Sequence, residues 1–349
     1  ASDVYKHQGS TDAKGQAIDY YKNMGNWSKY NADGTPADGA QHLFADTDWQ
    51  DQIYRTAVST DQNVTLTGAY KNLPYRVSLG YTKQQGVLKT SDYERYTASV
   101  SLNPTFFDDH LAVNFNAKGM YSKTSYASTS AIGSAVSMDP TKPVYMNDDF
   151  YKQNFGGYFQ YHSVVDRGDT AWGFSQNSLS THNPVHYLNE ASDKGKGKEL
   201  TGNIELDYKI HGFEDLHLHA NLAGEYSDGG EYNTNNPRST YGFYYGGNSE
   251  NKEKKYNLVA TAYAQYTKDF NKANHFDIMA GYEYSHMKYW GNQWSKSMYP
   301  NTYEGKNDAG QALAGTVKSY DTSNWKGQTF LVSWYGRANY SLLDRYLLT

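Results

Sequence analysis

Two pairs of histidines have the residue spacing that best suits metal binding in this chain. His217 and His219 are two residues apart, so on a β-strand both imidazoles would point to the same face. Two imidazoles make half of a typical zinc site, but no third ligand is identifiable for this pair or for His182 and His186. We therefore interpret His217 and His219 as polar residues of a hydrated face, and we predict no metal site at either pair.

Carboxylates are plentiful, and the acidic series Asp33, Asp38, Asp46 and Asp48 could in principle bind calcium. Its spacing is not that of a known calcium loop, so a solvated loop is the better interpretation. The sequence contains no Gly-x-Ser-x-Gly elbow, phosphate loop or His-Glu-x-x-His motif. We predict no catalytic residues and no cofactor, and hence a protein that is not an enzyme.

Aromatic side chains in the longer connections are the better candidates for ligand binding. Rings stack on the apolar faces of sugars or hold peptide side chains, while their polar atoms remain available for hydrogen bonds. The alternative is that they pack the loops against each other and against a partner protein. The candidate substrate-binding residues are Tyr145, Tyr151, Tyr158, Tyr161, Trp172, Phe174, Tyr244, Tyr245, Trp290 and Trp294.

Composition excludes several classes of protein. The net charge of −5 argues against nucleic acid as a partner, because phosphate binding needs clustered Lys and Arg. The absence of cysteine excludes disulfides, thiolate metal sites and a cysteine nucleophile from these 349 residues. Mean hydropathy is −0.84, and no run approaches the roughly 18 apolar residues of a transmembrane helix.

The elements that must position these residues alternate apolar and polar side chains with period two. In residues 110–121, Leu111, Val113 and Phe115 interleave with Ala112, Asn114 and Asn116, which predicts a strand with one apolar and one largely polar face. About ten segments repeat the pattern. The polar faces include Asn114, Asn116, Asn203, Glu205, Asp207, Arg337 and Asn339.

Every second connection between these segments is a few residues long, and the others include long loops at about 126–198, 233–253 and 291–326. Short turns on one side, long loops on the other and 35 tyrosines favour an antiparallel transmembrane β-barrel of the outer membrane over a soluble sandwich. We expect a loop-rich segment over 1–61, with short helices near 17–24 and 48–57, and a partial barrel over 62–349. The last residues have the pattern of the start of another strand, and an open sheet edge would be costly in lipid. We therefore expect these strands to be part of a larger barrel.

Several ordered motifs resemble the SusC/RagA family of TonB-dependent outer-membrane transporters of Bacteroidetes. The resemblance is clearest over residues 47–349. It rests on the segments TDWQDQIYRTA (47–57), YRVSLGY (75–81), GVLKT (86–90), ERY (94–96), AVSMDPTKPVY (135–145), YGRANYS (335–341) and DRYLLT (344–349).

The resemblance implies about the first half of a 22-stranded barrel, without its N-terminal plug and C-terminal strands. It further implies TonB-dependent import of oligosaccharides or peptides, a SusD-like surface lipoprotein as lid, and coupling to the TonB complex through an N-terminal region that is missing here. The polar strand faces would then contact the plug and water. A passive porin-like channel and a secreted β-rich carbohydrate-binding protein remain the alternatives.

Overall fold

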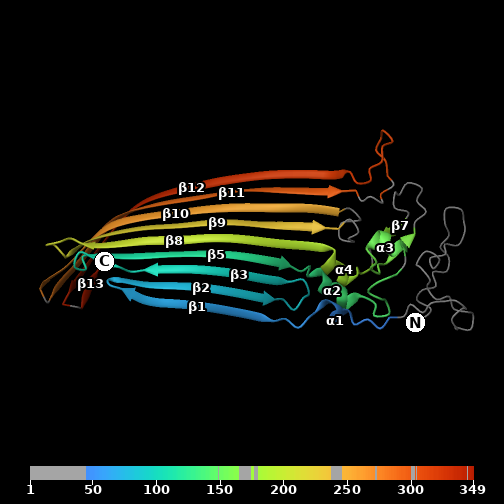
Figure 1. Cartoon of the computed structure of the whole chain (residues 1–349). Helices are drawn as coiled ribbons and strands as arrows, with labels where there is room; N and C mark the ends of the chain where they lie inside the picture. The colour runs from blue at the N-terminus through green and yellow to red at the C-terminus, as the bar shows by residue number, and fades with distance from the viewer. Residues whose placement is uncertain are drawn as a thin grey trace, which may run out of the picture.

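The computed structural model describes residues 45–147, 149–164, 174–176, 180–236, 246–271, 273–299, 303, 305–343 and 345–349. Within these ranges eleven strands form one antiparallel sheet in the order β1-β2-β3-β5-β8-β9-β10-β11-β12-β13, and β4 pairs with β5. Figure 1 shows the strands side by side from β1 to β12, with the helices gathered at one end of the sheet. The antiparallel sheet predicted from the alternation is confirmed.

The strands differ in length, and those in the second half of the chain are the longest. Their bounds are β1 Ser59–Tyr70, β2 Leu73–Gln85, β3 Asp92–Leu102, β4 Thr105–Phe106, β5 Leu111–Tyr126, β8 Ala191–Lys209, β9 Leu216–Asn235, β10 Gly246–Asn271, β11 Asn274–Met298, β12 Val317–Leu342 and β13 Tyr346–Leu348. A separate pair joins β6 (His162–Val164) to β7 (Phe174–Gln176). The helices are α1 Trp49–Ile53, α2 Ser130–Ser137, α3 Asp149–Phe155 and α4 Pro184–Asn189.

Strand register gives the sheet one apolar and one largely polar face. One cross-strand row is Leu111, Tyr208, Leu218, Ala264, Ala280 and Gly336. The neighbouring row, on the other face, is Asp207, His219, Tyr263, Gly281 and Tyr335. Since a one-residue slip would exchange the faces, the register is what separates them. On the apolar face Trp334 is 80% exposed, an arrangement suited to lipid rather than to water.

Aromatic rings border the apolar face at both ends. Tyr81, Tyr96 and Tyr121 form a chain with ring centroids 5.0 and 6.4 Å apart. At the short-turn end Phe276 lies 4.6 Å from Tyr340. Tyr121 lies ten positions after Leu111 on β5, which corresponds to about 33 Å along a strand. After a 35–45° tilt this length spans about 25 Å of membrane, which matches the apolar band of an outer-membrane barrel.

The strands extend well beyond the boundaries that the alternation predicts. β8 begins at Ala191, inside the loop predicted at 126–198. The loops predicted at 233–253 and 291–326 are likewise too long, because β9 continues to Asn235, β10 begins at Gly246, β11 ends at Met298 and β12 begins at Val317. Outside the apolar band both faces of a strand can be polar, so alternation disappears while the backbone ladder continues.

The helix predicted at 48–57 is shorter than expected. Asp48 caps α1 by accepting hydrogen bonds from the amides of Gln50 and Asp51 at 3.0 and 3.1 Å, and the helix ends before Tyr54, which is extended. Tyr54 instead forms a bridge with Leu88. The helix predicted near 17–24 lies outside the described residues. None of the described helices has the length and hydropathy needed to span a membrane.

Candidate functional site

The four helices and the segments between them build a compact apolar cluster at the long-loop end of the sheet, which we call the loop core. Ile53, Tyr151, Phe155 and Phe159 are fully buried there. The complete loop core is Trp49, Ile53, Leu88, Ala131, Ala135, Met138, Met146, Tyr151, Phe155, Tyr158, Phe159, Val185 and Leu188. Burial of these side chains stabilises the conformation of the loops at this end of the sheet.

Asn183 fixes the segments that cross the loop core. Its side-chain oxygen accepts hydrogen bonds from the amides of Val185 and His186 at 3.0 and 3.3 Å, so it caps α4. Its side-chain nitrogen donates to the carbonyls of Val144 and Phe159 at 2.9 and 3.1 Å. One fully buried amide therefore joins three chain segments and leaves no need for water between them.

The segments that carry the family resemblance meet in this region. The indole nitrogen of Trp49 donates to the carbonyl of Asp139 at 2.9 Å, which connects residues 47–57 to residues 135–145. Arg55 donates to the carbonyls of Gly86 and Ser91 at 3.0 and 2.7 Å and pairs with Asp92 at 3.0 Å. These motif residues hold the loop core against the β2–β3 connection.

Candidate aromatic residues of the first segment divide into packing and exposed groups. Tyr151 is fully buried, and Tyr158 is buried beneath Asn189, which donates to its hydroxyl at 3.0 Å. Burial raises the pKa of Tyr158 to about 12. Tyr161 is half-buried and packs edge-on against Phe159 at 5.1 Å. Tyr145 is 58% exposed and packs against Tyr158 with ring centroids 5.0 Å apart and planes tilted by 41°, so it offers the most ring surface of the four.

The remaining aromatic candidates lie on other elements or outside the described residues. Trp290 and Trp294 lie on β11 at even-numbered positions that share the face of Ala280 and Tyr282. Above the apolar band, Trp294 donates to Glu250 at 3.0 Å and lies 6.4 Å from the ring of Tyr232. Phe174 begins β7. Trp172, Tyr244 and Tyr245 lie outside the described residues.

The two histidine pairs have different surroundings. His186 is buried in α4 and stacks on Tyr158 at 4.7 Å, whereas His182 lies within 3.2 Å of the Gln160 amide. His217 and His219 do share a face of β9, as predicted, and the structure adds a third group, Asp207 of β8. Among the described residues these three form the only cluster with three possible metal ligands. The pairing of Asp207 with His219 across the β8–β9 hairpin is the signal that the sequence interpretation missed.

Of the four aspartates considered as calcium ligands, the structure describes Asp46 and Asp48. Asp48 is occupied as the cap of α1, and Asp46 is exposed. Asp33 and Asp38 lie outside the described residues.

Polar rows on the opposite face of the sheet form hydrogen-bonded ladders. Asp277 accepts from Gln265 at 2.6 Å and from Thr267 at 3.3 Å, and Arg337 lies 3.5 Å away. Asn116 donates to Asn114 at 2.8 Å. Such a face is suited to water or to a polar protein surface, because its charges could not be placed in hydrocarbon without a large cost.

Comparison with known proteins gives relatives of one kind. The chain is 45% identical over 307 residues to the TonB-dependent receptor SusC of Bacteroides thetaiotaomicron, covering 87% of this chain and 30% of the relative. It is 25% identical over 319 residues to the TonB-dependent receptor P3 of Formosa agariphila, with 87% and 29% covered. The chain thus spans about three tenths of the length of these relatives. No family model matches.

Solved structures of the RagAB peptide importer share the fold. The 'open-open' state aligns with a TM-score of 0.59 at 14% identity, covering 96% of this chain and 36% of that one. The 'closed-closed' state aligns with a TM-score of 0.56 at 16% identity, covering 85% and 31%. At these identities the structural match supports the architecture alone, while the SusC match supports the family. TonB-dependent receptors are outer-membrane proteins, which agrees with the apolar band. The chain therefore belongs to the SusC/RagA family of TonB-dependent outer-membrane receptors, of which it spans a stretch of β-barrel wall with its loops.

Proposed function

We propose that the whole protein imports oligosaccharides or peptides across the outer membrane in a TonB-dependent manner, as the barrel partner of a SusD-like surface lipoprotein. The single observation that carries the proposal is a sheet with a lipid-type apolar face and a polar face, in a chain 45% identical to a TonB-dependent receptor. The proposed role is transport without catalysis, consistent with relatives named as receptors and importers.

The loop core supports the proposal by supplying a rigid surface at the end of the sheet where the longer connections lie. Exposed loop surface held on a packed scaffold is a common arrangement for ligand binding. Tyr145 is the most exposed of the four candidate tyrosines in residues 145–161, and its ring packs against the buried ring of Tyr158. We assign it as the first candidate for substrate stacking, with the rest of the loop surface available to the lipoprotein.

The first test is the intact mass of the native protein, extracted from membranes in detergent, together with the identity of whatever co-purifies. A polypeptide much heavier than the 39.4 kDa of these residues, accompanied by a surface lipoprotein, is the expected result. A mass near 39.4 kDa with no partner would contradict the proposal and leave a small channel or a soluble β-protein.

Energy dependence separates active import from a passive channel. Uptake by cells carrying the whole protein should stop when a protonophore is added and when TonB is deleted. Uptake that continues under both conditions would support the porin-like alternative and overturn TonB coupling.

Tyr145 allows the substrate class to be tested. Against a panel of linear oligosaccharides and of short peptides, Tyr145→Ala should weaken binding of the accepted class by about fivefold, since one aromatic contact contributes about 1 kcal/mol. Tyr145→Phe keeps the ring and should bind nearly as well as the unmodified protein. Equal binding by all three proteins, measured by calorimetry, would remove Tyr145 from the proposed site.

A further inference from the structure

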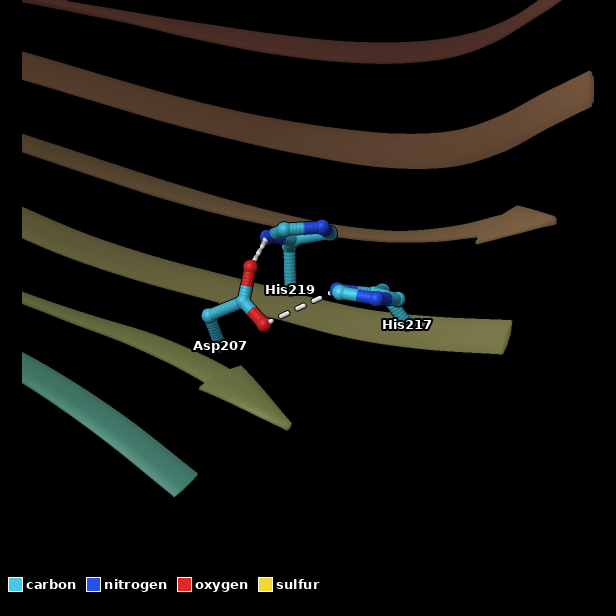
Figure 2. A group of neighbouring side chains, drawn as sticks. All are labelled: Asp207, His217 and His219. Carbon is cyan, nitrogen blue, oxygen red and sulfur yellow. Dashed lines mark hydrogen bonds and ion pairs between the residues drawn. The ribbon is translucent and has the colours of Figure 1, made fainter. Parts of the chain in front are cut away.

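The polar face of the sheet holds a cluster of two imidazoles and one carboxylate near its short-turn end. Figure 2 shows the Asp207 carboxylate beside the two imidazole rings, with one oxygen directed at each. Its Oδ2 lies 2.8 Å from Nδ1 of His219, and its Oδ1 lies 3.1 Å from Nδ1 of His217. We propose that Asp207, His217 and His219 form a binding site for one divalent transition-metal ion.

The donor set identifies the class of ion. One ligand atom from each residue can be chosen so that all three lie within 4.8 Å of one another. Two imidazole nitrogens and a carboxylate oxygen suit Zn²⁺, Ni²⁺, Cu²⁺ or Fe²⁺, whereas Ca²⁺ and Mg²⁺ require oxygen ligands. Metal–ligand bonds of about 2.0–2.2 Å place tetrahedral ligands about 3.4 Å apart. The two nitrogen–oxygen distances of 2.8 and 3.1 Å are about 0.6 and 0.3 Å shorter than this separation, so side-chain rotations would have to open the position for the ion.

Strand pairing holds the three residues of the cluster in fixed positions, whereas histidines on surface loops are generally less constrained. Asp207 lies directly opposite His219 in the β8–β9 ladder, and His217 is the next residue of β9 on the same face. The backbone hydrogen bonds of two strands therefore fix all three Cα positions. A site assembled on strands holds its ligands more accurately than one assembled on loops.

Packing on the far side of His219 fixes the orientation of one ring. Tyr263 of β10 stacks on His219 with centroids 4.3 Å apart and planes 19° from parallel. The next residue in the row is Gly281, where a Cβ atom would lie 2.5 Å from the Tyr335 ring and 2.7 Å from Cβ of Tyr263. Glycine at this position leaves room for both tyrosines, and Tyr263 in turn limits the rotation of His219.

The three side chains are partly accessible, so an ion could reach them from the polar face. Their side chains are between 16% and 32% exposed. Three protein ligands leave at least one coordination position for water. Two residues farther along β9 on the same face, Asn221 has a buried side-chain oxygen without a hydrogen-bond partner. This oxygen is a candidate acceptor for a metal-bound water.

Charges around the site act in both directions. Glu205 precedes Asp207 on the same face of β8 and favours a cation, while Lys209 lies directly opposite His217 and opposes one. Metal binding here would therefore depend on coordination geometry more than on nearby charges, which again favours a transition metal over a hard cation.

The experiment uses the whole protein, purified in detergent, stripped with EDTA and titrated with Co²⁺ and Zn²⁺. Co²⁺ reports nitrogen and oxygen coordination by its visible absorption, and Zn²⁺ affinity follows from competition with a chromophoric chelator. His217→Ala, His219→Ala and Asp207→Asn should each remove one equivalent of metal or weaken its binding by about 100-fold or more, since even outer-shell changes cost 10–100-fold.

A matched control is available at the same end of the sheet. His275 pairs with Asp269 at 2.6 Å, and within the described part of the chain this pair belongs to no group of three possible metal ligands, so His275→Ala should leave metal stoichiometry and the Co²⁺ spectrum unchanged. Heat-modified mobility on gels verifies that each variant is folded. Folded His219→Ala and Asp207→Asn proteins that bind metal as well as the unmodified protein would overturn the site and leave a hydrogen-bonded cluster only.

Discussion

The loop core and the strand sheet bury apolar side chains in opposite ways. In the loop core Ile53 is 0% exposed and packs against protein, whereas on β12 Trp334 is 80% exposed on the apolar face. The loop core follows the rule of a water-soluble domain, in which apolar residues gather inside. The sheet follows the rule of an outer-membrane wall, in which they face lipid and the polar residues face water. One region of the chain is therefore adapted to water and the other to lipid. We expect the loop core to be sensitive to loss of buried apolar groups and the sheet to be sensitive to charges on its lipid face.

The largest effect is expected in the loop core. Phe155 is fully buried and lies 5.8 Å from Tyr151, so Phe155→Ala should lower the free energy of unfolding of the loop core by about 3–5 kcal/mol. Hydrogen exchange of the α3 and α4 amides would measure it, with the β8–β11 amides unaffected. Tyr145→Ala, at the exposed edge, is the control. It should change the free energy of unfolding obtained from hydrogen exchange by less than about 0.5 kcal/mol. Equal effects of the two variants would show that the loop core is not a packed unit.

A slightly smaller effect is expected from a charge on the lipid face. Ile204 lies on the apolar face at the middle of the band on β8, and Asn203 points to the polar face. Ile204→Arg should destabilise the protein in lipid vesicles by about 2–4 kcal/mol, while Asn203→Arg should be nearly neutral. Denaturant titration in vesicles provides the measurement. The assignment of faces would be wrong if Asn203→Arg proved the more damaging substitution.

The smallest effect concerns pH and involves His182, in the segment that precedes α4. Burial lowers the pKa of His182 below its ordinary value. The unfolded segment therefore binds a proton more readily, and the stability that His182 contributes is full above about pH 6.5 and declines as pH falls below it. Hydrogen exchange of α4 between pH 7.5 and 5 should show this decline, and His182→Gln should reduce it. An unchanged pH dependence in that variant would exclude His182 as the responsible group.

Strand identity and the division into faces could be predicted because side-chain period and lipid contact leave a direct pattern in residues such as Leu111, Val113 and Phe115. Strand ends could not, because Lys194, Lys196 and Lys198 of β8 show no apolar face outside the bilayer. The sequence likewise could not predict that Tyr145 is exposed and Tyr151 is buried. Both are tyrosines of one aromatic-rich loop, and only the packing of Tyr151 against Phe155 and Phe159 distinguishes them.

By itself the sequence determined the all-β class, the two-faced strands and the family, because each depends on local periodicity or on ordered motifs. Only the tertiary structure decided which distant groups meet. It joined Trp49 to Asp139 beside the loop core, and it brought Asp207 together with His217 and His219. The physical reason is register: neighbours on a chain are fixed by covalent bonds, but neighbours across a hairpin are fixed by backbone hydrogen bonding between strands and by which face the solvent selects.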